Sequence, residues 1–507
     1  MNLGMAAKVD AALASVERGV PATVIASGKR HDVIHEIIRG DLIGTLFIAD
    51  PSVEYQQGNP SDTADSARSA SLSLQKLPLE VRVSALHLLA QKLEDGERDI
   101  LEANSVDLDR AQRSNLSTQT LNRLKLTREK LKVLSDGIRD IAAATVDPIG
   151  RLLRQTQLSE SLFLQQVSVP IGVLLVIFES RPDALIQIAA LSIFSANGLL
   201  LKGGKEASAS NRALFRIVRE TLRTVSSQAN AANLEQLVHL IESRESVHSL
   251  LSLTDSIDLI IPRGSNRLVN QIRNDTKIPV LAHAEGICHV YVDREADIQK
   301  ALNVVIDAKT NYPSACNAME TLLIHDSWFP HAISLLSALQ SAHVTLHFSP
   351  RAKLLLSKHA DAASLLASAP LLDDEWDTSK FSVEHGSMAC TVHFVSSLVE
   401  AIDHINTYGS SHTDSIITEN SSSASSFLTS VDSACVFHNA STRFADGYRF
   451  GLGAEVGIST NRIHARGPVG IDGLCTQKWL LRSTSQTGDA VDEYSKHKRF
   501  EFIHSKL

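Results

Sequence analysis

The chain has 507 residues, so two or more domains are expected, and its net charge of −8 argues against nucleic-acid binding. Five cysteines without a Cys-x-x-Cys pair argue against a disulfide framework and against a structural zinc site, so no metal is expected. No apolar run reaches the roughly 18 residues that span a bilayer.

The first third of the chain is predicted to be mainly helical. Residues 51–67 contain prolines, a glycine and several Ser and Asp residues, which is typical of a linker. Before it we expect helices at 5–16 and 33–39 and a strand at 22–26; after it we expect helices around 79–93, 97–113 and 127–144.

Residues 154–169 change character, because Leu158, Leu162, Leu164 and Val167 alternate with polar residues and predict a two-stranded ribbon. From Ile171 onward, apolar strands alternate with amphipathic helices, which indicates a parallel sheet covered on both faces. The strands are predicted at 172–178, 199–201, 237–241, 257–261, 278–281 and 288–292, and the main helices between them at 184–196 and 208–224.

Three of these strands end in groups that suit a ligand, since parallel sheets bind ligands beyond their carboxyl ends. The segments are 179–183, 202–205 and 263–266, and the last precedes a helix start, which favours phosphate. The alternative is that all three are ordinary βα turns. A Gly-x-Gly-x-x-Gly motif is absent, so the usual dinucleotide fingerprint is missing.

Cys316 lies in a polar turn, after Pro313 and before an apolar strand predicted at 321–325. A thiol on such a loop can meet a ligand, although a cysteine is often an inert buried residue. Farther on, residues 438–455 are rich in glycine and poor in aliphatic residues. Arg443, Arg449 and Arg466 could clamp a carboxylate or a phosphate, or each could form a surface salt bridge.

Several long motifs resemble gamma-glutamyl phosphate reductases, including the reductase half of delta-1-pyrroline-5-carboxylate synthases. They are Phe178–Asp183, Leu201–Glu206, Asn311–Thr321, Ala401–Ile405, Tyr408–Asp414, Asn439–Thr460 and His464–Gly470. At the N-terminus, Val24–Gly28 and Gly44–Phe47 resemble the tail of a glutamate 5-kinase domain. The resemblance therefore implies a bifunctional enzyme truncated at its N-terminus, without glutamate 5-kinase activity of its own.

The resemblance implies an α/β, aldehyde-dehydrogenase-like fold with two parallel-sheet domains and an oligomerisation β-ribbon. The implied parts are a kinase remnant at 1–50, the linker at 51–67, an NADPH-binding domain at 68–150 and 167–285, oligomerisation strands at 151–166 and about 471–485, a catalytic domain at 286–470, and a tail at 486–507.

The implied reaction is NADPH-dependent reduction of L-glutamyl 5-phosphate to glutamate 5-semialdehyde, in proline synthesis. Cys316 would form a thioester, with Ser180 or Asn317 completing an oxyanion hole. NADPH or NADP would contact Lys202, Gly203, Lys205, Arg263, Gly264, Ser265 and Glu384; the substrate would contact Arg181, Ser441, Thr442, Arg443 and Arg466. The glutamate base of hydrolytic relatives is replaced by His283, with Glu285 close by.

Two rival functions are a non-catalytic subunit of a proline-synthesis assembly and a thiol acyltransferase or hydrolase. The resemblance implies a homo-oligomer that depends on a separate glutamate 5-kinase, with no membrane partner, in the cytoplasm or mitochondrion. The ending Ser505-Lys506-Leu507 matches a peroxisomal address, or is a chance ending.

Overall fold

The computed structural model divides the chain into two units, Met1–Asn59 and Pro60–Leu507, and we describe each by itself. In the first unit, β1 (Ala22–Ile25) pairs antiparallel with β2 (Thr45–Ile48), which confirms the predicted strand, and residues 11–15 are helical. The structure describes residues 8–9, 11–15, 22–27, 45–48, 59–144, 146–242, 244–282, 285–367, 376–496 and 502–505. The helix predicted at 33–39 lies outside these residues.

The second unit begins with helix α3, which corrects part of the predicted linker. α3 (Pro60–Leu74) starts on a proline, which is tolerated in the first turn of a helix, and it carries Asp62 close to its positive end. Ala64, Ala67 and Leu74 then form its buried face. Further helices follow: α4 (Leu79–Asp95), α5 (Glu97–Arg113), α6 (Thr118–Leu124) and α7 (Arg128–Ala142). Three of them confirm predicted helices, whereas the short α6 was not predicted.

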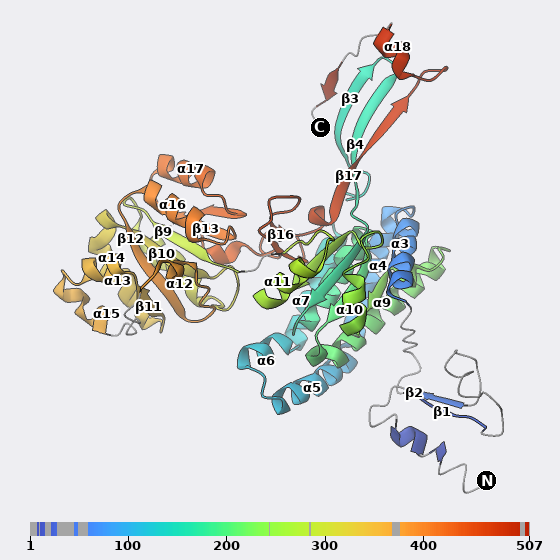
Figure 1. The fold of residues 1–507 in the computed structure, drawn as a ribbon, viewed down its shortest axis with the longest axis horizontal. Helices are drawn as coiled ribbons and strands as arrows, with labels where there is room; N and C mark the ends of the chain where they lie inside the picture. Colours follow the sequence, from blue (N-terminus) through green and yellow to red (C-terminus); the bar gives the residue numbers. More distant parts are fainter. Residues whose placement is uncertain are drawn as a thin grey trace. The chain divides into compact units, whose positions relative to one another are not determined.

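A four-stranded parallel sheet follows, with strand order β7-β6-β5-β8. Figure 1 shows helices on both faces of this sheet, as the alternating pattern predicted. The strands are β5 (Val173–Phe178), β6 (Gly198–Gly203), β7 (Val238–Leu240) and β8 (Leu259–Arg263); the helices between and after them are α8 (Pro182–Phe194), α9 (Ser208–Gln228), α10 (Arg244–Leu250) and α11 (Asn266–Asp275).

The prediction of a strand at 278–281 is wrong. Only Val280 forms an isolated parallel bridge, to Ile260, because Pro279 has no N–H to donate to a ladder.

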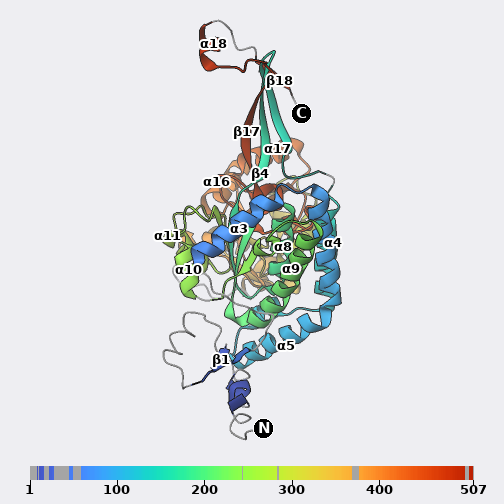
Figure 2. The same ribbon diagram turned by 90° about the vertical axis from the view of Figure 1, so that its right-hand side faces the viewer.

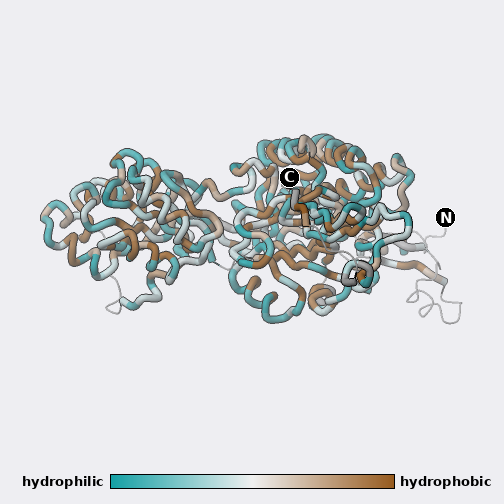
Figure 3. The backbone as a smooth tube through the Cα atoms, turned by 90° about the horizontal axis from the view of Figure 1, so that it is seen from above, coloured by the Kyte–Doolittle hydropathy of each residue, from teal (hydrophilic) through white to brown (hydrophobic). Residues whose placement is uncertain are grey.

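The other large sheet has six parallel strands in the order β11-β12-β10-β9-β13-β14. Its alternating side chains pack into two cores, one against α12 to α15 and one against α16 and α17. The strands are β9 (Cys288–Val292), β10 (Met319–His325), β11 (Thr345–Phe348), β12 (Ala389–Val395), β13 (Thr413–Ile417) and β14 (Cys435–His438). The helices are α12 (Ile298–Thr310), α13 (Phe329–Ser341), α14 (Pro350–Leu356), α15 (Ala363–Ala367), α16 (Leu398–Tyr408) and α17 (Ser421–Ser430). Figure 3 shows hydrophobic stretches running through the interior of the chain.

The predicted ribbon is present as β3 (Leu152–Ser159) and β4 (Leu162–Pro170), paired antiparallel. Two strands from the end of the chain extend it, β17 (Cys475–Ser483) beside β4 and β18 (Ile503–Ser505) beside β3. Figures 1 and 2 both show β3, β4 and β17 side by side. The remaining elements are β15 (Gly457–Ser459), β16 (Gly467–Val469) and α18 (Val491–Lys496). Lys506 and Leu507 lie outside the described residues, so the peroxisomal address stays a prediction.

No helix in the described ranges is long and apolar enough to cross a membrane.

Three histidines lie together where α16 packs on the six-stranded sheet: His404 on α16, His393 on β12 and His289 on β9. The ring of His404 stacks on that of His393 at 5.3 Å and meets that of His289 edge-on at 5.5 Å. Burial, followed by the neighbouring histidines, lowers the pKa of His404 to about 2, and burial lowers the pKa of His393 to about 4. The rings of His404 and His393 are therefore neutral in the folded protein at ordinary pH.

This cluster predicts acid sensitivity. A histidine whose folded pKa lies below its unfolded value stabilises the protein above pH 6.5, and this stabilisation is lost as the pH falls toward the folded pKa. Between pH 7.5 and pH 5, the free energy of unfolding should fall by about 2 kcal/mol less in His404→Phe than in the parent protein. Urea unfolding at the two pH values measures this difference. His87→Phe, on the exposed face of α4, is the control and should lose as much stability as the parent.

Candidate active site

Cys316 lies on the loop between α12 and β10, as predicted. The loop contains two tight turns, in which the Ala315 N–H donates to the Tyr312 carbonyl and the Ala318 N–H to the Ala315 carbonyl. Tyr312 takes a left-handed backbone conformation, with φ of 60°. Cys316 is partly exposed, whereas the other four cysteines are buried. Cys316 is therefore the one of the five cysteines that solvent reaches appreciably.

The backbone of this loop rests against the segment that enters β9. A Cβ atom on Gly286 would lie 1.9 Å from the Cys316 carbonyl oxygen and 2.6 Å from its Cα, so only glycine fits there. The buried thiol of Cys288 donates to the same carbonyl oxygen at 3.3 Å. Burial raises the pKa of Cys288 well above its ordinary value, so this thiol stays protonated and serves as a structural group. The sequence reasoning missed Gly286, whose requirement depends on a contact 30 residues away in the chain.

The segment 439–455, which we call the arginine loop, is bonded to the cysteine loop from the other side. Arg443 Nε donates to the Asn311 carbonyl at 2.6 Å, and Asn317 Nδ2 donates to the Ala445 carbonyl at 2.9 Å. The guanidinium of Arg449 donates to the Arg443 carbonyl. Two predicted site segments that lie far apart in sequence thus form one structure around Cys316.

Three charged side chains lie within electrostatic reach of Cys316: Arg443, which is buried, and Arg263 and Glu455, which are partly buried. Burial lowers the pKa of Arg263 and of Arg443, while a Cys316 thiolate raises both. Burial also raises the pKa of Glu455, which lies 4.0 Å from the guanidinium of Arg263. Arg263, at the end of β8, lines a cavity together with Glu455 and Arg181. Nearby guanidinium groups favour the thiolate form of a cysteine, which is its nucleophilic form.

Both predicted oxyanion side chains have partners within the protein. The Ser180 N–H and hydroxyl donate to Glu206 Oε1 at 2.7 and 2.8 Å, on a left-handed turn with φ of 51°. The Asn317 amide nitrogen donates to Ala445, and its buried Oδ1 has no hydrogen-bond partner in the described part of the chain. The oxyanion role of either side chain stays a prediction.

The predicted cofactor residues lie at the carboxyl ends of β6 and β8. In the order β7-β6-β5-β8 the connections reverse direction between β5 and β8, which is where such sheets bind nucleotides. Lys202 Nζ donates to the Gly203 carbonyl at 2.7 Å, and Ser265 caps α11. Lys205 begins a short 3₁₀ turn after β6.

Internal contacts already explain the two glycines among these residues. A Cβ on Gly203 would lie 2.1 Å from Asn211 Nδ2, and one on Gly264 would lie 2.5 Å from Glu179 Oε2. The same carboxyl oxygen of Glu179 accepts the Ser265 N–H at 3.1 Å. The start of α11 is therefore occupied by a carboxylate in this structure.

Glu384, predicted to hold the nicotinamide ribose, lies on a segment fixed by a buried ion pair. Lys309 Nζ lies 3.2 Å from Glu320 Oε1, and both side chains are fully buried. The Glu320 carboxylate accepts the N–H groups of His385 and Gly386 at 2.9 and 3.3 Å. Burial raises the pKa of Glu320 to about 7. The sequence signal for this pair was a glutamate inside an otherwise apolar strand, which the sequence reasoning did not use.

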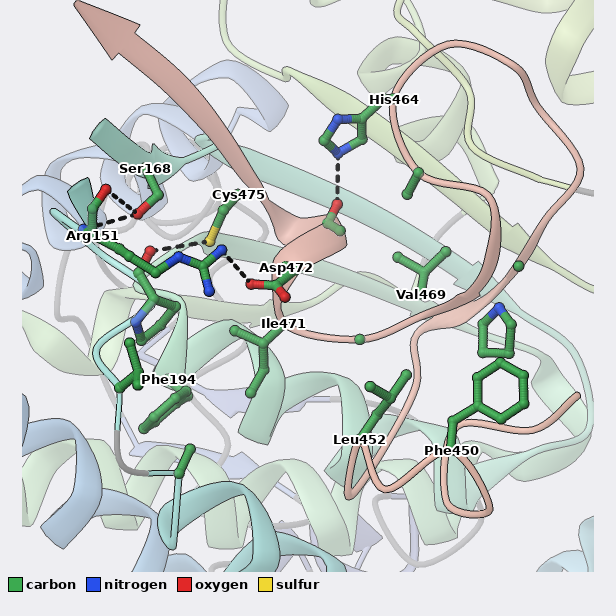
Figure 4. Close-up of a pocket in the computed structure, with 18 of the residues that line it drawn as sticks. Arg151, Ser168, Phe194, Phe450, Leu452, His464, Val469, Ile471, Asp472 and Cys475 are labelled. Carbon is green, nitrogen blue, oxygen red and sulfur yellow. Dashed lines mark hydrogen bonds and ion pairs between the residues drawn. The ribbon is translucent and has the colours of Figure 1, made fainter. Parts of the chain in front are cut away.

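The structure does not bring Arg466 to the cavity lined by the other predicted substrate residues Ser441 and Arg443. Its guanidinium donates to the Asp432 carboxylate at 3.0 Å and to the Asp432 carbonyl at 3.1 Å. It lines a cavity of about 1120 Å³ at the base of β17. Figure 4 shows this cavity, with Arg151 paired to Asp472 and His464 bonded to the Gly473 carbonyl.

The remaining predicted residues are dispersed. Arg181 lines a cavity of about 220 Å³ together with Arg263 and Glu455, and Thr442 is buried with an unbonded hydroxyl within the described ranges. His283 lies outside the described residues, and Glu285 accepts a hydrogen bond from Asn266 at 3.0 Å. No group of three or more metal-ligating side chains occurs among the residues described.

Two parallel-sheet domains with a cysteine loop and an antiparallel ribbon define an aldehyde-dehydrogenase-like oxidoreductase, and residues 53–352 match the aldehyde dehydrogenase family. A gamma-glutamyl phosphate reductase of Natronomonas pharaonis is 44% identical over 448 residues, which cover 87% of this chain and 97% of that protein. The chain belongs to the gamma-glutamyl phosphate reductase family.

Two further comparisons agree with this assignment. The solved gamma-glutamyl phosphate reductase of Thermotoga maritima matches with a TM-score of 0.77 and 31% identity, over 85% of this chain and 100% of that one. Delta-1-pyrroline-5-carboxylate synthase B of Arabidopsis thaliana is 47% identical over 96% of this chain. The chain spans 64% of the length of that synthase.

Proposed function

We propose that this protein reduces L-glutamyl 5-phosphate to L-glutamate 5-semialdehyde and phosphate, with NADPH as the reductant, as a step of proline biosynthesis. The observation that carries the proposal is the partly exposed Cys316 within electrostatic reach of the guanidinium groups of Arg443, which is buried, and of Arg263, which is partly buried. An acyl phosphate is an activated, anionic substrate, so it needs a thiolate and positive charge and no water-activating base.

The chemistry begins with attack of the Cys316 thiolate on the acyl carbon. The C–S bond forms, the C–O bond to phosphate breaks, and inorganic phosphate leaves with the electron pair. A nicotinamide cofactor, when bound, supplies the hydride that reduces the thioester. The thiolate of Cys316 is then expelled as the aldehyde is released, so the cysteine is regenerated.

The chain's own residues suit this cofactor. The switch point between β5 and β8 gives the crevice, and Lys202 and Lys205 stand at the neighbouring end of β6. We assign Lys202, with Lys205 second, to the 2′-phosphate that distinguishes NADPH from NADH.

The assignment predicts that Lys202→Ala raises the KM for NADPH by about ten- to a hundredfold, because charge-assisted contacts to phosphate contribute roughly 1.5–3 kcal/mol. The KM for NADH should change much less. Steady-state kinetics with both cofactors provide the measurement, and Lys92→Ala on α4 is a control. An equal change for NADPH and NADH would remove Lys202 from the 2′-phosphate.

The experiment that tests the proposed function runs the reaction in reverse. With glutamate 5-semialdehyde and NADP, the purified protein should form NADPH continuously only when inorganic phosphate is present. Sustained NADPH formation without phosphate would mean that water accepts the acyl group, and the protein would then be a hydrolytic dehydrogenase.

We further propose that the protein is a homo-oligomer that assembles through the ribbon. β17 is an edge strand, and its residues Trp479 and Leu481 are 52% and 59% exposed. An edge strand with exposed large apolar side chains is suited to pair with a second chain, which would cover those side chains.

A further inference from the structure

A cavity of about 520 Å³ lies between α12 and the arginine loop. Asp307 and Asn311 line it from α12 and the start of the cysteine loop, and Ser441, Arg443 and Arg449 line it from the arginine loop. Because Arg443 bonds to the carbonyl of Asn311, five residues before Cys316, this cavity adjoins the loop that carries the nucleophile.

The cavity has two cations without acid partners. Arg443 is only 7% exposed, yet no carboxylate lies within 4.0 Å of its guanidinium, or of that of Arg449, among the described residues. Burial and the charge of Arg449 both lower the pKa of Arg443. A buried charge without a counter-ion is costly, so Arg443 is suited to an anionic group that comes from a ligand, and the exposed Arg449 beside it can contribute a second positive charge.

The cavity also has one acid. Asp307 is the only carboxylate that lines it in the described part of the chain, and its Oδ1 accepts from Asn311 Nδ2 at 2.9 Å. The charges of Cys316, Asp446 and, least of the three, Asp307 raise the pKa of Arg443, and Asp307 is too far from the guanidinium to form an ion pair. A carboxylate set apart from two guanidinium groups matches the α-ammonium and α-carboxylate of an amino acid.

We propose that Asp307 is a specificity-determining residue that binds the α-ammonium group of the substrate, while Arg443 and Arg449 bind its α-carboxylate. This inference rests on the proposed function, because it places the amino-acid end of the glutamyl substrate in this cavity and its acyl end at Cys316. The site then favours a semialdehyde that carries an α-amino group over one of the same length that lacks it.

The test compares two aldehydes in the reverse reaction with NADP and phosphate: glutamate 5-semialdehyde, and 5-oxopentanoate, which lacks the amino group. The readout is the kcat/KM for glutamate 5-semialdehyde divided by the kcat/KM for 5-oxopentanoate. In Asp307→Asn this ratio should fall about ten- to a hundredfold, with activity on 5-oxopentanoate kept within about threefold. Asp307→Glu, which keeps the charge, should retain more of the ratio. Asp403→Asn, an exposed acid on α16, is the matched control and should leave the ratio unchanged.

An unchanged ratio in Asp307→Asn would overturn the inference, as would an equal loss for both aldehydes, which indicates a structural role. If Asp307→Asn does not fold, Asp307→Ala takes its place with the same expected fall in the ratio, and an unchanged ratio in that variant overturns the inference. If the parent protein oxidises neither aldehyde in a phosphate-dependent way, the proposed function itself fails, and this inference fails with it.

Discussion

Replacing Cys316 by alanine should lower turnover by at least about 10⁴-fold, because no other group in the proposed mechanism can form the thioester. The affinity for NADPH, measured by fluorescence titration, should stay close to that of the parent protein, since the proposed mechanism uses the thiol for bond exchange with the acyl group and not for binding the cofactor. Substantial residual turnover would remove Cys316 from the chemistry.

The matched control is Cys288→Ala, in the buried cysteine that contacts the backbone of the same loop. Its buried thiol bonds to the carbonyl of Cys316 at 3.3 Å, so the change removes one hydrogen bond next to the nucleophile without removing the nucleophile. We expect stability to fall by about 1 kcal/mol and turnover to stay within about tenfold. A loss as large as that of Cys316→Ala would show that the two thiols act together.

The second large effect is expected at Gly286. A methyl group there would enter the space of the Cys316 backbone, at 1.9 Å from its carbonyl oxygen, and backbone atoms cannot move aside as a flexible side chain can. Gly286→Ala should therefore displace the cysteine loop and lower kcat/KM by about a hundredfold, since small misplacements of reacting groups cost that much. It should also destabilise the protein by about 1–3 kcal/mol.

Gly150→Ala separates this clash from the general effect of replacing a glycine. Gly150 has a φ of 76° and no atom within 4 Å of an added Cβ, so alanine there meets backbone strain alone. Kinetics and urea unfolding should show a small loss of stability and unchanged turnover. Equal kinetics for Gly286→Ala and the parent protein would mean that the contact with Cys316 does not position the nucleophile.

Much of the fold was predictable from local pattern. The uninterrupted apolar run of β5, the short apolar run within β10 and the apolar stripe along α4 predicted these elements, since burial on both faces of a strand or on one face of a helix sets the pattern. The errors came from local signals that tertiary contacts override. Pro60 and its polar neighbours suggested a linker, but α3 forms because its alanines pack against the first parallel sheet.

The site was predictable only in part, because its geometry depends on contacts between distant segments. Cys316 and Arg443 stood out in the sequence as a loop cysteine and a loop arginine. Nothing local showed that Gly286 supports the cysteine, or that Asp307 lines the same cavity as Arg443. Conversely, Arg466 had the same appearance as Arg443 in the sequence, yet its partner in the structure is Asp432.

The most direct test of the central claim is a pre-steady-state measurement without phosphate. When the protein is mixed with glutamate 5-semialdehyde and NADP, acyl transfer stops at the thioester, since no phosphate is present to accept the acyl group. We expect a burst of one NADPH per chain, a glutamyl group on the peptide that contains Cys316 by mass spectrometry, and release of that group when phosphate is added. A burst without modification of Cys316, or a modified Cys316 that phosphate does not discharge, would contradict the account.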